Sequence, residues 1–172
     1  KFYFRMVIRE VPFIAIAFVG VVQIIVDSFY FDKMYGTSSY PITANVIGML
    51  DGFDMFFLII IVFYSGELIW KERISNIHLI IDATPVKDWV NLSAKFIGMM
   101  MINLSIMLLL IFMGVMVQAA HGYFNFELPL YFKSMFTSTL SFVLLYTLLS
   151  FFVQVMSNNK FIGFAMMFVF FL

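Results

Sequence analysis

Residues 64–96, YSGELIWKERISNIHLIIDATPVKDWVNLSAKF, form a charged stretch between two long apolar segments. This stretch, called the charged island below, contains four of the chain's ten basic residues and four of its ten acidic residues. Charged side chains are costly in the interior of a bilayer. Because the segments on both sides are apolar, we expect the charged island to leave the membrane and to connect two membrane-spanning helices.

The composition of the chain is that of a membrane protein. Of the 172 residues, 63% are hydrophobic and 12% are charged, whereas soluble domains contain about 25% charged residues. The net charge is zero, so no nucleic-acid partner is indicated. The chain has no cysteine, which excludes disulfides, thiolate metal sites and cysteine nucleophiles.

Apolar segments separated by polar turns predict an all-α fold, a polytopic bundle of transmembrane helices. Lipid offers no hydrogen-bond partner to the backbone, so helices are the expected spanning structure. The predicted architecture is about four full spans and a truncated fifth, at residues 11–26, 46–70, 96–120, 134–156 and 161–172. The fifth segment is shorter than the roughly 20 residues that a span needs, and the chain starts at Lys1. We therefore interpret residues 1–172 as part of a longer membrane protein.

The distribution of Lys and Arg predicts the orientation of the spans, because short cytoplasmic loops carry an excess of these residues. If the spans alternate in direction, eight basic residues lie on one side, in the N-terminal flank, the charged island and the turn before the fifth span. Lys33 and Lys133 lie on the other side. We therefore expect the N-terminal flank and the charged island in the cytoplasm.

Apolar residues recur at helical spacing inside the charged island. Trp70, Ile74, Ile77 and Ile81 are separated by four, three and four positions, which predicts an amphipathic helix between spans 2 and 3. Such a helix either lies on the membrane surface as an anchor or docks a cytoplasmic partner. The spacing alone leaves both interpretations open.

Two shorter patterns refine the prediction for the charged island. Glu67 and Lys71 stand four residues apart, in the order that favours an ion pair along one helix. Thr84 followed by Pro85 is typical of a helix start. We therefore expect a break after the amphipathic helix and a second helix that continues into span 3.

The strings GELIWKER at 66–73 and ATPVKDWVNLSAKF at 83–96 resemble the cytoplasmic loop of ABC transporter permeases of the type-2 exporter (ABC-2) family. The resemblance is strongest to large bacterial permeases that are fused to a zinc aminopeptidase-like domain. Further strings agree with these permeases in the same order: YPIT at 40–43, Gln118, GYFNFE at 122–127, YFK at 131–133, and Asn159-Lys160 with Gly163. The similarity covers nearly the whole chain, which implies a partial permease domain.

The resemblance also implies a role for the charged island. In that family the loop between the second and third spans carries a coupling helix, which sits on the ATPase subunit and passes its closing motion to the spans. The implied partners are an ABC ATPase that holds ATP and magnesium, a second permease half or homodimer partner, and the lipid of a bacterial cytoplasmic membrane. Carried over by position, the ATPase-coupling residues are Glu67, Lys71, Glu72, Arg73, Ile74, Asn76, Ile77, His78 and Asp82.

The chain departs from the full-length permeases in two respects. It has fewer spans, and it has neither the His-Glu-x-x-His motif of a zinc peptidase nor the Gly-x-x-x-x-Gly-Lys-Ser/Thr motif of a phosphate-binding loop. We therefore expect no catalytic, metal-binding or cofactor-binding residue in this chain, and ATP hydrolysis on another polypeptide. The substrate stays open, and export is implied by the resemblance.

Asp51 and Asp54, near the outer end of span 2, are candidates for a substrate pathway, because ionisable groups at membrane depth are often functional. The alternative is that both carboxylates are hydrated in the outer headgroup region and passive. The two aspartates are also the feature that comes nearest to a membrane-embedded enzyme. An ion-coupled secondary transporter is a further alternative.

Polar residues within the spans predict contacts between helices. Serines at a four-three spacing on span 4 predict a packing face of small residues: Ser134, Ser138 and Ser141. Four further side chains are expected to form hydrogen bonds between helices: Gln23, Asn103, Ser105 and Gln118.

Overall fold

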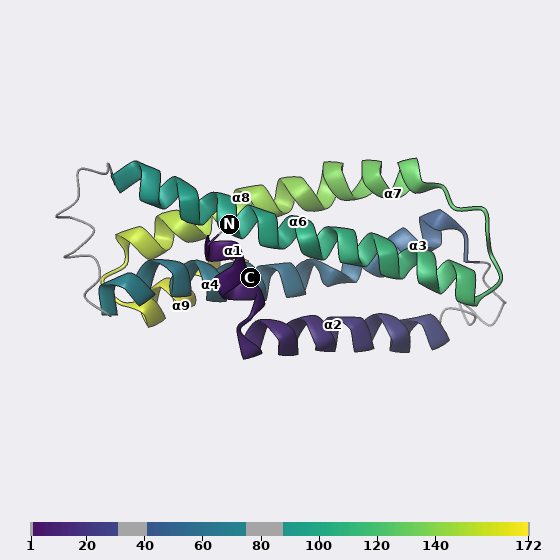
Figure 1. The fold of residues 1–172 in the computed structure, drawn as a ribbon, viewed down its shortest axis with the longest axis horizontal. Coiled ribbons are helices and arrows are strands. Elements are labelled where there is room, and N and C mark those ends of the chain that lie inside the picture. Colours follow the sequence, from purple (N-terminus) through teal and green to yellow (C-terminus); the bar gives the residue numbers. More distant parts are fainter. Residues whose placement is uncertain (1, 31–40, 75–87, 172) are drawn as a thin grey trace.

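The computed structural model describes residues 2–30, 41–74 and 88–171, and these residues form an elongated bundle of helices with no strand among them (Figure 1). A 3-10 turn, Asp51–Phe53, joins α3 to α4, and a π-helical segment, Met135–Thr139, joins α7 to α8. The α-helices are α1 Phe2–Ile8, α2 Val11–Tyr30, α3 Thr43–Leu50, α4 Asp54–Ile74, α6 Asp88–Ala120, α7 Leu128–Ser134, α8 Leu140–Met156 and α9 Lys160–Phe171. The predicted all-helical fold is confirmed for this part of the chain.

Within the part of the chain that the structure describes, four helical segments are long and apolar enough to cross a membrane: Val11–Tyr30, Thr43–Lys71, Trp89–Ala120 and Leu128–Met156. They coincide with the four predicted full spans but extend beyond the predicted boundaries. The 33 residues of α6 correspond to roughly 50 Å of helix, against a hydrocarbon thickness of about 30 Å. The predicted fifth span is represented by α9, a shorter apolar helix. The predicted amphipathic helix and the Thr84 helix start lie outside the described residues.

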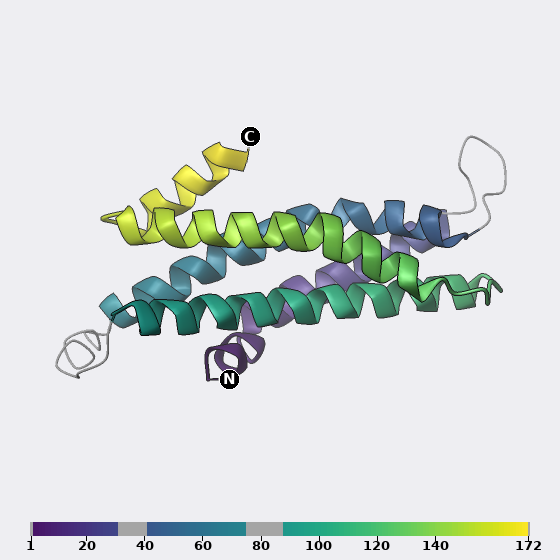
Figure 2. The same cartoon turned by 90° about the horizontal axis from the view of Figure 1, so that it is seen from above.

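The bundle is built around α4, α6 and α8, which run along its length (Figures 1 and 2). Ser65 of α4 lies against Ser150 of α8, and Trp70, five residues further along α4, contacts Gln154, four residues further along α8. Both helices advance toward their C-terminal ends from the first contact to the second, so α4 and α8 run parallel. Apolar side chains of these helices fill the core, with Phe57, Leu58, Ile61, Ile102, Met107 and Val143 nearly or fully buried.

The remaining helices lie around this centre. In Figure 1, α2 runs along one side of the bundle, and α9 turns back from the end of α8. The short α1 packs on α6, where the Tyr3 hydroxyl donates to Asn91 Oδ1 at 2.9 Å. Gly98 permits this close approach, because a Cβ at that position would lie 3.0 Å from the Cβ of Tyr3.

Gln118 joins three helices at the end of the bundle where α6 finishes. Its Nε2 donates to the carbonyl oxygen of Pro41 at 3.1 Å and to Thr43 Oγ1 at 3.2 Å. The Tyr131 hydroxyl donates to Gln118 Oε1 at 2.9 Å. The predicted interhelical hydrogen bonds of Gln118 are therefore confirmed. The three partners occupy α3, the residues just before it, and α7.

The same prediction is wrong for three other residues, whose side chains bond within their own helix. Gln23 donates to Asp27, four residues further along α2. Asn103 donates to the carbonyl oxygen of Met99, and Ser105 to that of the residue four positions earlier. A carbonyl one turn back in the same helix is within reach of Asn103 and Ser105, whereas Gln23 reaches a carboxylate one turn ahead. The Oδ1 atom of Asn103 is buried and has no hydrogen-bond partner among the described residues.

The predicted serine face of span 4 is not the face that packs in this chain. Ser138 and Ser141 are exposed, and the Ser141 hydroxyl donates to the carbonyl oxygen of Thr137 at 2.8 Å. The inward face of α8 instead presents Thr147 and Ser150, both fully buried. The π-helical segment interrupts the regular spacing between the predicted serines, which a count of three and four positions does not anticipate.

Candidate functional site

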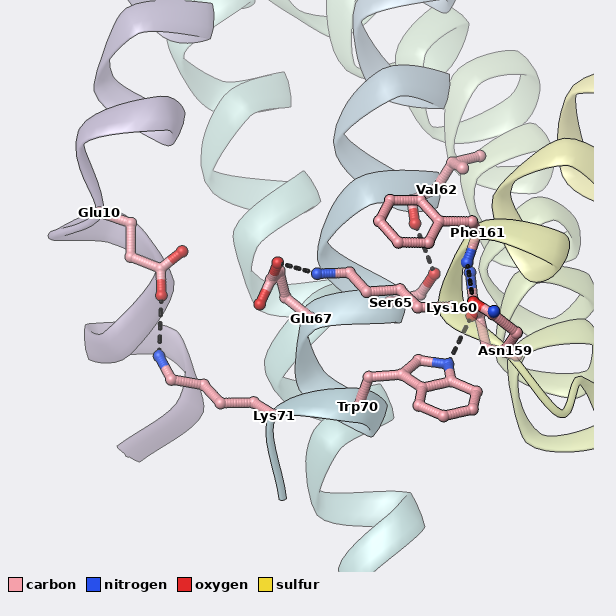
Figure 3. Close-up of polar contacts among 10 residues, drawn as sticks. Glu10, Val62, Ser65, Glu67, Trp70, Lys71, Asn159, Lys160 and Phe161 are labelled. Atoms are coloured by element: carbon pink, nitrogen blue, oxygen red, sulfur yellow. Dashed lines mark hydrogen bonds and ion pairs between the residues drawn. The ribbon is translucent and has the colours of Figure 1, made fainter. Parts of the chain in front are cut away.

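Charged side chains gather where α4 approaches its C-terminal end (Figure 3). Among the described residues, ion pairs and an indole hydrogen bond connect this part of α4 to other elements of the bundle. We call this group the ion-pair cluster, and its members are Glu10, Glu67, Trp70, Lys71, Gln154 and Lys160.

The first ion pair joins Glu67 of α4 to Lys160, the first residue of α9. The side chains retain 25% and 20% of their exposure, so the pair is mostly shielded from solvent. The Lys160 ammonium also lies 5.9 Å from the ring centroid of Phe63 and 5.6 Å from that of Phe164. Aromatic faces attract a cation at this range, so the lysine is held by one carboxylate and two rings.

The second ion pair joins Lys71 to Glu10, with 3.2 Å between Nζ and Oε1. Glu10 lies in the turn between α1 and α2, so this contact spans 61 positions of the chain. The side chain of Lys71 is half-exposed, at 51%, so this pair is more accessible to solvent than the first. Figure 3 shows the two ion pairs leaving α4 toward different elements.

The predicted ion pair between Glu67 and Lys71 is therefore wrong. Glu67 pairs with the first residue of α9, and Lys71 pairs with Glu10 in the turn between α1 and α2, rather than with each other. The physical reason is the low dielectric of the bundle. A shielded carboxylate gains more from a shielded ammonium that is also hydrogen-bonded than from an exposed lysine on its own helix.

Close backbone packing brings α4, α8 and α9 together beside the ion pairs. The Trp70 indole donates to Gln154 Oε1 at 3.0 Å. A Cβ at Gly66 would overlap the ring of Phe164, and a Cβ at Gly163 would overlap the carboxamide of Gln154. Two glycines thus let α9 lie directly against α4 and α8, which positions Lys160 for its contact with Glu67.

The other predicted coupling residues are described only in part. Glu72 and Arg73 lie in the last turn of α4, and Ile74, its final residue, is 70% exposed. Asn76, Ile77, His78 and Asp82 lie outside the described residues. The structure therefore shows where α4 leads into the charged island, and it leaves the predicted docking surface as a prediction.

Asp51 and Asp54 are separated from the ion-pair cluster. Asp51 opens the 3-10 turn and Asp54 the first turn of α4, and both side chains are exposed. Thirteen residues of helix separate Asp54 from Glu67, which corresponds to roughly 20 Å along α4. The two predicted groups thus form separate sites at different depths. No three His, Asp or Glu side chains gather as a metal site within the described residues.

Sequence reasoning missed the partners that complete the ion-pair cluster. In the sequence, Lys160 and the N-terminal flank predict the orientation of the spans, and Lys160 also belongs to a string of the family resemblance. Neither pattern predicts an ion pair, and Gln154 belongs to no pattern. One signal was present: Gln154 is an uncharged polar residue inside an otherwise apolar segment. The choice of Glu67 as the partner of Lys160 has no local signal, because 93 positions separate them.

Comparisons with known proteins return no relative for this chain. No protein-family model matches it, and neither a curated protein nor a solved structure matches it. The functional conclusion therefore depends on the sequence strings described above and on the contacts of the ion-pair cluster.

Proposed function

We propose that this chain is part of the membrane-spanning permease of an ATP-driven ABC exporter in a bacterial cytoplasmic membrane. A separate ATPase subunit binds ATP and magnesium and hydrolyses the nucleotide. The permease converts the closing motion of that subunit into movement of a substrate across the membrane. A second permease half, or a second copy of the chain, completes the pathway.

The observation that supports this proposal most directly is the set of contacts at the end of α4. The charged island begins within α4 and continues beyond Ile74, the last residue of that helix, so a force on the later part of the island acts on α4 first. Glu67 ties α4 to α9, and Lys71 ties it to the turn before α2. A displacement of α4 therefore moves two further helices, which is the property that a coupling element requires.

The shielding of one ion pair adds to this argument. Lys160 is held by Glu67 and by two aromatic rings, so its link to α4 resists stretching more than an exposed ion pair does. The close packing at Gly66 and Gly163 leaves little room for α9 to move relative to α4. Together these contacts support a rigid connection between the island and the bundle, rather than a loose surface anchor.

Site-directed crosslinking tests the proposal. Single cysteines at Ile74 and at Asn76, in the full-length protein with any cysteines outside residues 1–172 replaced, would carry a short crosslinker. The matched control is a cysteine at Phe124, which is 72% exposed in the loop between α6 and α7. Membranes would be treated with and without ATP, and crosslinked products would be identified by mass spectrometry.

We expect the Ile74 and Asn76 variants to crosslink to an ABC ATPase, with a yield that changes when nucleotide is added. Phe124 should give no such product, because the predicted orientation places it across the membrane. If both island positions are shielded by lipid and reach no ATPase, the coupling role is rejected and the island is a membrane anchor. Equal crosslinking at Phe124 would contradict the predicted orientation.

A further inference from the structure

The regular helix is interrupted in two of the membrane-length segments. Between α3 and α4 the chain forms the 3-10 turn Asp51–Phe53, and between α7 and α8 it forms the π-helical segment Met135–Thr139. In Figure 2, α3 leaves the line of α4 and α7 leaves the line of α8 at these points. Short 3-10 and π-helical segments inside longer helices often mark hinges or functional positions. Both segments are therefore candidates for joints within the bundle.

Contacts with α6 place the two irregular segments at a similar depth. A Cβ at Gly114 of α6 would lie 3.1 Å from Tyr131 Cε1 and 3.2 Å from Leu50 Cδ1. Leu50 directly precedes the 3-10 turn, and Tyr131 lies four residues before the π-helical segment. Both α3 and α7 run toward the middle of the bundle from the end where α6 finishes (Figure 1). Since four residues of helix advance about 6 Å, the two segments lie within roughly one turn of each other.

Polar contacts group the helices around these segments into two bodies. The first, called the α6 body, contains α3, α6 and α7, which the buried hydrogen bonds of Gln118 hold together. The second, called the α4 body, contains α4, α8 and α9. It is held together by contacts described above: Ser65–Ser150, Trp70–Gln154 and Glu67–Lys160. The chain thus passes from the α6 body into the α4 body at each of the two irregular segments.

The contact between the two bodies is largely apolar. Between positions 99 and 111, α6 buries mostly methionine and aliphatic side chains: Met99, Ile102, Met107, Leu110 and Ile111. Asn103, a buried polar residue of this stretch, donates to its own helix. Hydrophobic contacts are non-directional, and methionine adapts to a shifted neighbour. The Glu10–Lys71 ion pair reaches from the α4 body to the turn before α2, and its half-exposed lysine has a flexible stem that can follow a small shift.

Space for a movement of the α4 body lies at the end of α6 and α8 that is remote from the joints. An apolar groove of about 350 Å³ separates the two helices there, and its lining includes Leu92 and Phe96 of α6 and Leu148, Phe152 and Val155 of α8. The 17 residues of α8 lie between the π-helical segment and this end. They correspond to roughly 25 Å of helix, so a tilt of about 10° shifts the end of α8 by about 4 Å.

We propose that Asp51–Phe53 and Met135–Thr139 form a paired hinge, about which α4, α8 and α9 tilt as one body and narrow the groove between α6 and α8. Hinges concentrate the change of φ and ψ in a few residues at the ends of elements. Two joints at one depth let α4 and α8 tilt together, so the contacts within the α4 body are kept. With a single joint, one of the two helices would stay fixed to the α6 body and these contacts would break.

The paired hinge goes beyond the proposed ATP-driven function and does not depend on it. Its argument uses only contacts and irregular segments within the described residues. The experiments that test it therefore contain no nucleotide and no ATPase, and a failure of the ATPase crosslinking described above would leave their outcome unaffected.

Distances between pairs of spin labels test whether two bodies move. Labelled cysteines would be placed in the full-length protein in liposomes, with any cysteines outside residues 1–172 replaced. The labelled positions are exposed and form three pairs, one across the groove, one within the α6 body and one within the α4 body: Leu92 with Val155, Met116 with Leu130, and Leu145 with Val169. We expect two distances for the groove pair, about 4 Å apart, and one distance for each of the other pairs.

Changes at the joints test whether they are the hinge. Gly52→Ala stiffens the 3-10 turn, and Gly48→Ala in α3 is the matched control, since neither new Cβ would have a neighbour within 4 Å. Gly52→Ala should change the ratio of the two groove distances by up to about fivefold, the effect of alanine in place of glycine in a helix. Gly48→Ala should leave the ratio unchanged. Deletion of the exposed Ser138 removes the extra residue of the π-helical segment and should leave a single groove distance.

Every other outcome overturns the proposal. A single groove distance in the unaltered protein would mean that the two segments are fixed bends. Distances within either body that vary as widely as the groove distance would mean that the helices do not move as two bodies. If Gly52→Ala or the Ser138 deletion leaves the two groove distances as they were, the altered segment is not a joint and the paired hinge is rejected. If the deletion variant does not fold, the comparison of Gly52→Ala with Gly48→Ala decides.

Discussion

Neutralising Glu67 should destabilise the bundle more than neutralising Glu10, although both carboxylates pair with a lysine. The perturbations are Glu67→Gln and Glu10→Gln, which keep the size of the side chain and remove its charge. Glu67 and Glu10 have the same side-chain exposure of 25%. Their partners differ, because Lys160 is 20% exposed and Lys71 is 51% exposed.

The size of the effect follows from this difference in shielding. Exposed ion pairs contribute about 0.2–1 kcal/mol, whereas removing one member of a buried pair costs about 3–5 kcal/mol. The Glu67–Lys160 pair lies between these limits, and Lys160 would keep its two aromatic contacts. We therefore expect Glu67→Gln to cost about 2 kcal/mol and Glu10→Gln about 0.5 kcal/mol or less.

Thermal unfolding in one detergent at a fixed protein concentration measures both effects. For a chain of this size, 1 kcal/mol corresponds to about 2–4 °C in Tm. Glu67→Gln should thus lower Tm by about 4–8 °C, and Glu10→Gln by about 2 °C at most. A double-mutant cycle with Lys160→Met and Lys71→Met should give a larger coupling for the first pair than for the second.

Two results would refute the reasoning. If the Glu67–Lys160 coupling were below about 0.3 kcal/mol, the measured stability would not depend on this contact. If the two pairs gave equal couplings, the exposure of the lysine would not be what sets their strength. Either result would also weaken the proposed force path from α4 to α9.

Two further substitutions test the packing of the bundle. Gly98→Ala should cost about 1–3 kcal/mol and make α1 sensitive to proteolysis, because the new Cβ would lie 3.0 Å from the Cβ of Tyr3. The control is Gly48→Ala, which should be neutral or stabilising because the new Cβ has no neighbour within 4 Å. Equal protease sensitivity of the two variants would contradict this prediction. Gln118→Leu should lower stability by about 2–3 kcal/mol in thermal unfolding, because it leaves the buried Tyr131 hydroxyl without its acceptor. A loss below about 0.5 kcal/mol would show that the hydrogen bonds of Gln118 contribute little to stability.

Hydropathy along the chain was sufficient to predict the helical class and the four long apolar helices. A membrane-length helix satisfies its backbone hydrogen bonds internally and buries its side chains in lipid or in neighbouring helices, so its signal lies in about 20 consecutive residues. The predicted contacts of Gln118 succeeded for a related reason: a carboxamide in an apolar span next to a turn has few ways to be satisfied except across helices. Boundaries were less accurate, as α2 shows, because it ends at Tyr30 and not at the predicted Val26.

The candidate site depended on information that no local pattern contains. The four-residue spacing of Glu67 and Lys71 predicted a pair along one helix, but tertiary packing gave Glu67 a partner 93 positions away and Lys71 a partner 61 positions away. Which charges meet is decided by how the helices pack, and Gly66 and Gly163 control that packing by letting α9 approach. The serine spacing on span 4 failed because a π-helical segment shifts the phase. Local sequence therefore determines that these helices form, and the tertiary structure alone determines which of their polar side chains come together, because ion-pair strength depends on the shielding that packing creates.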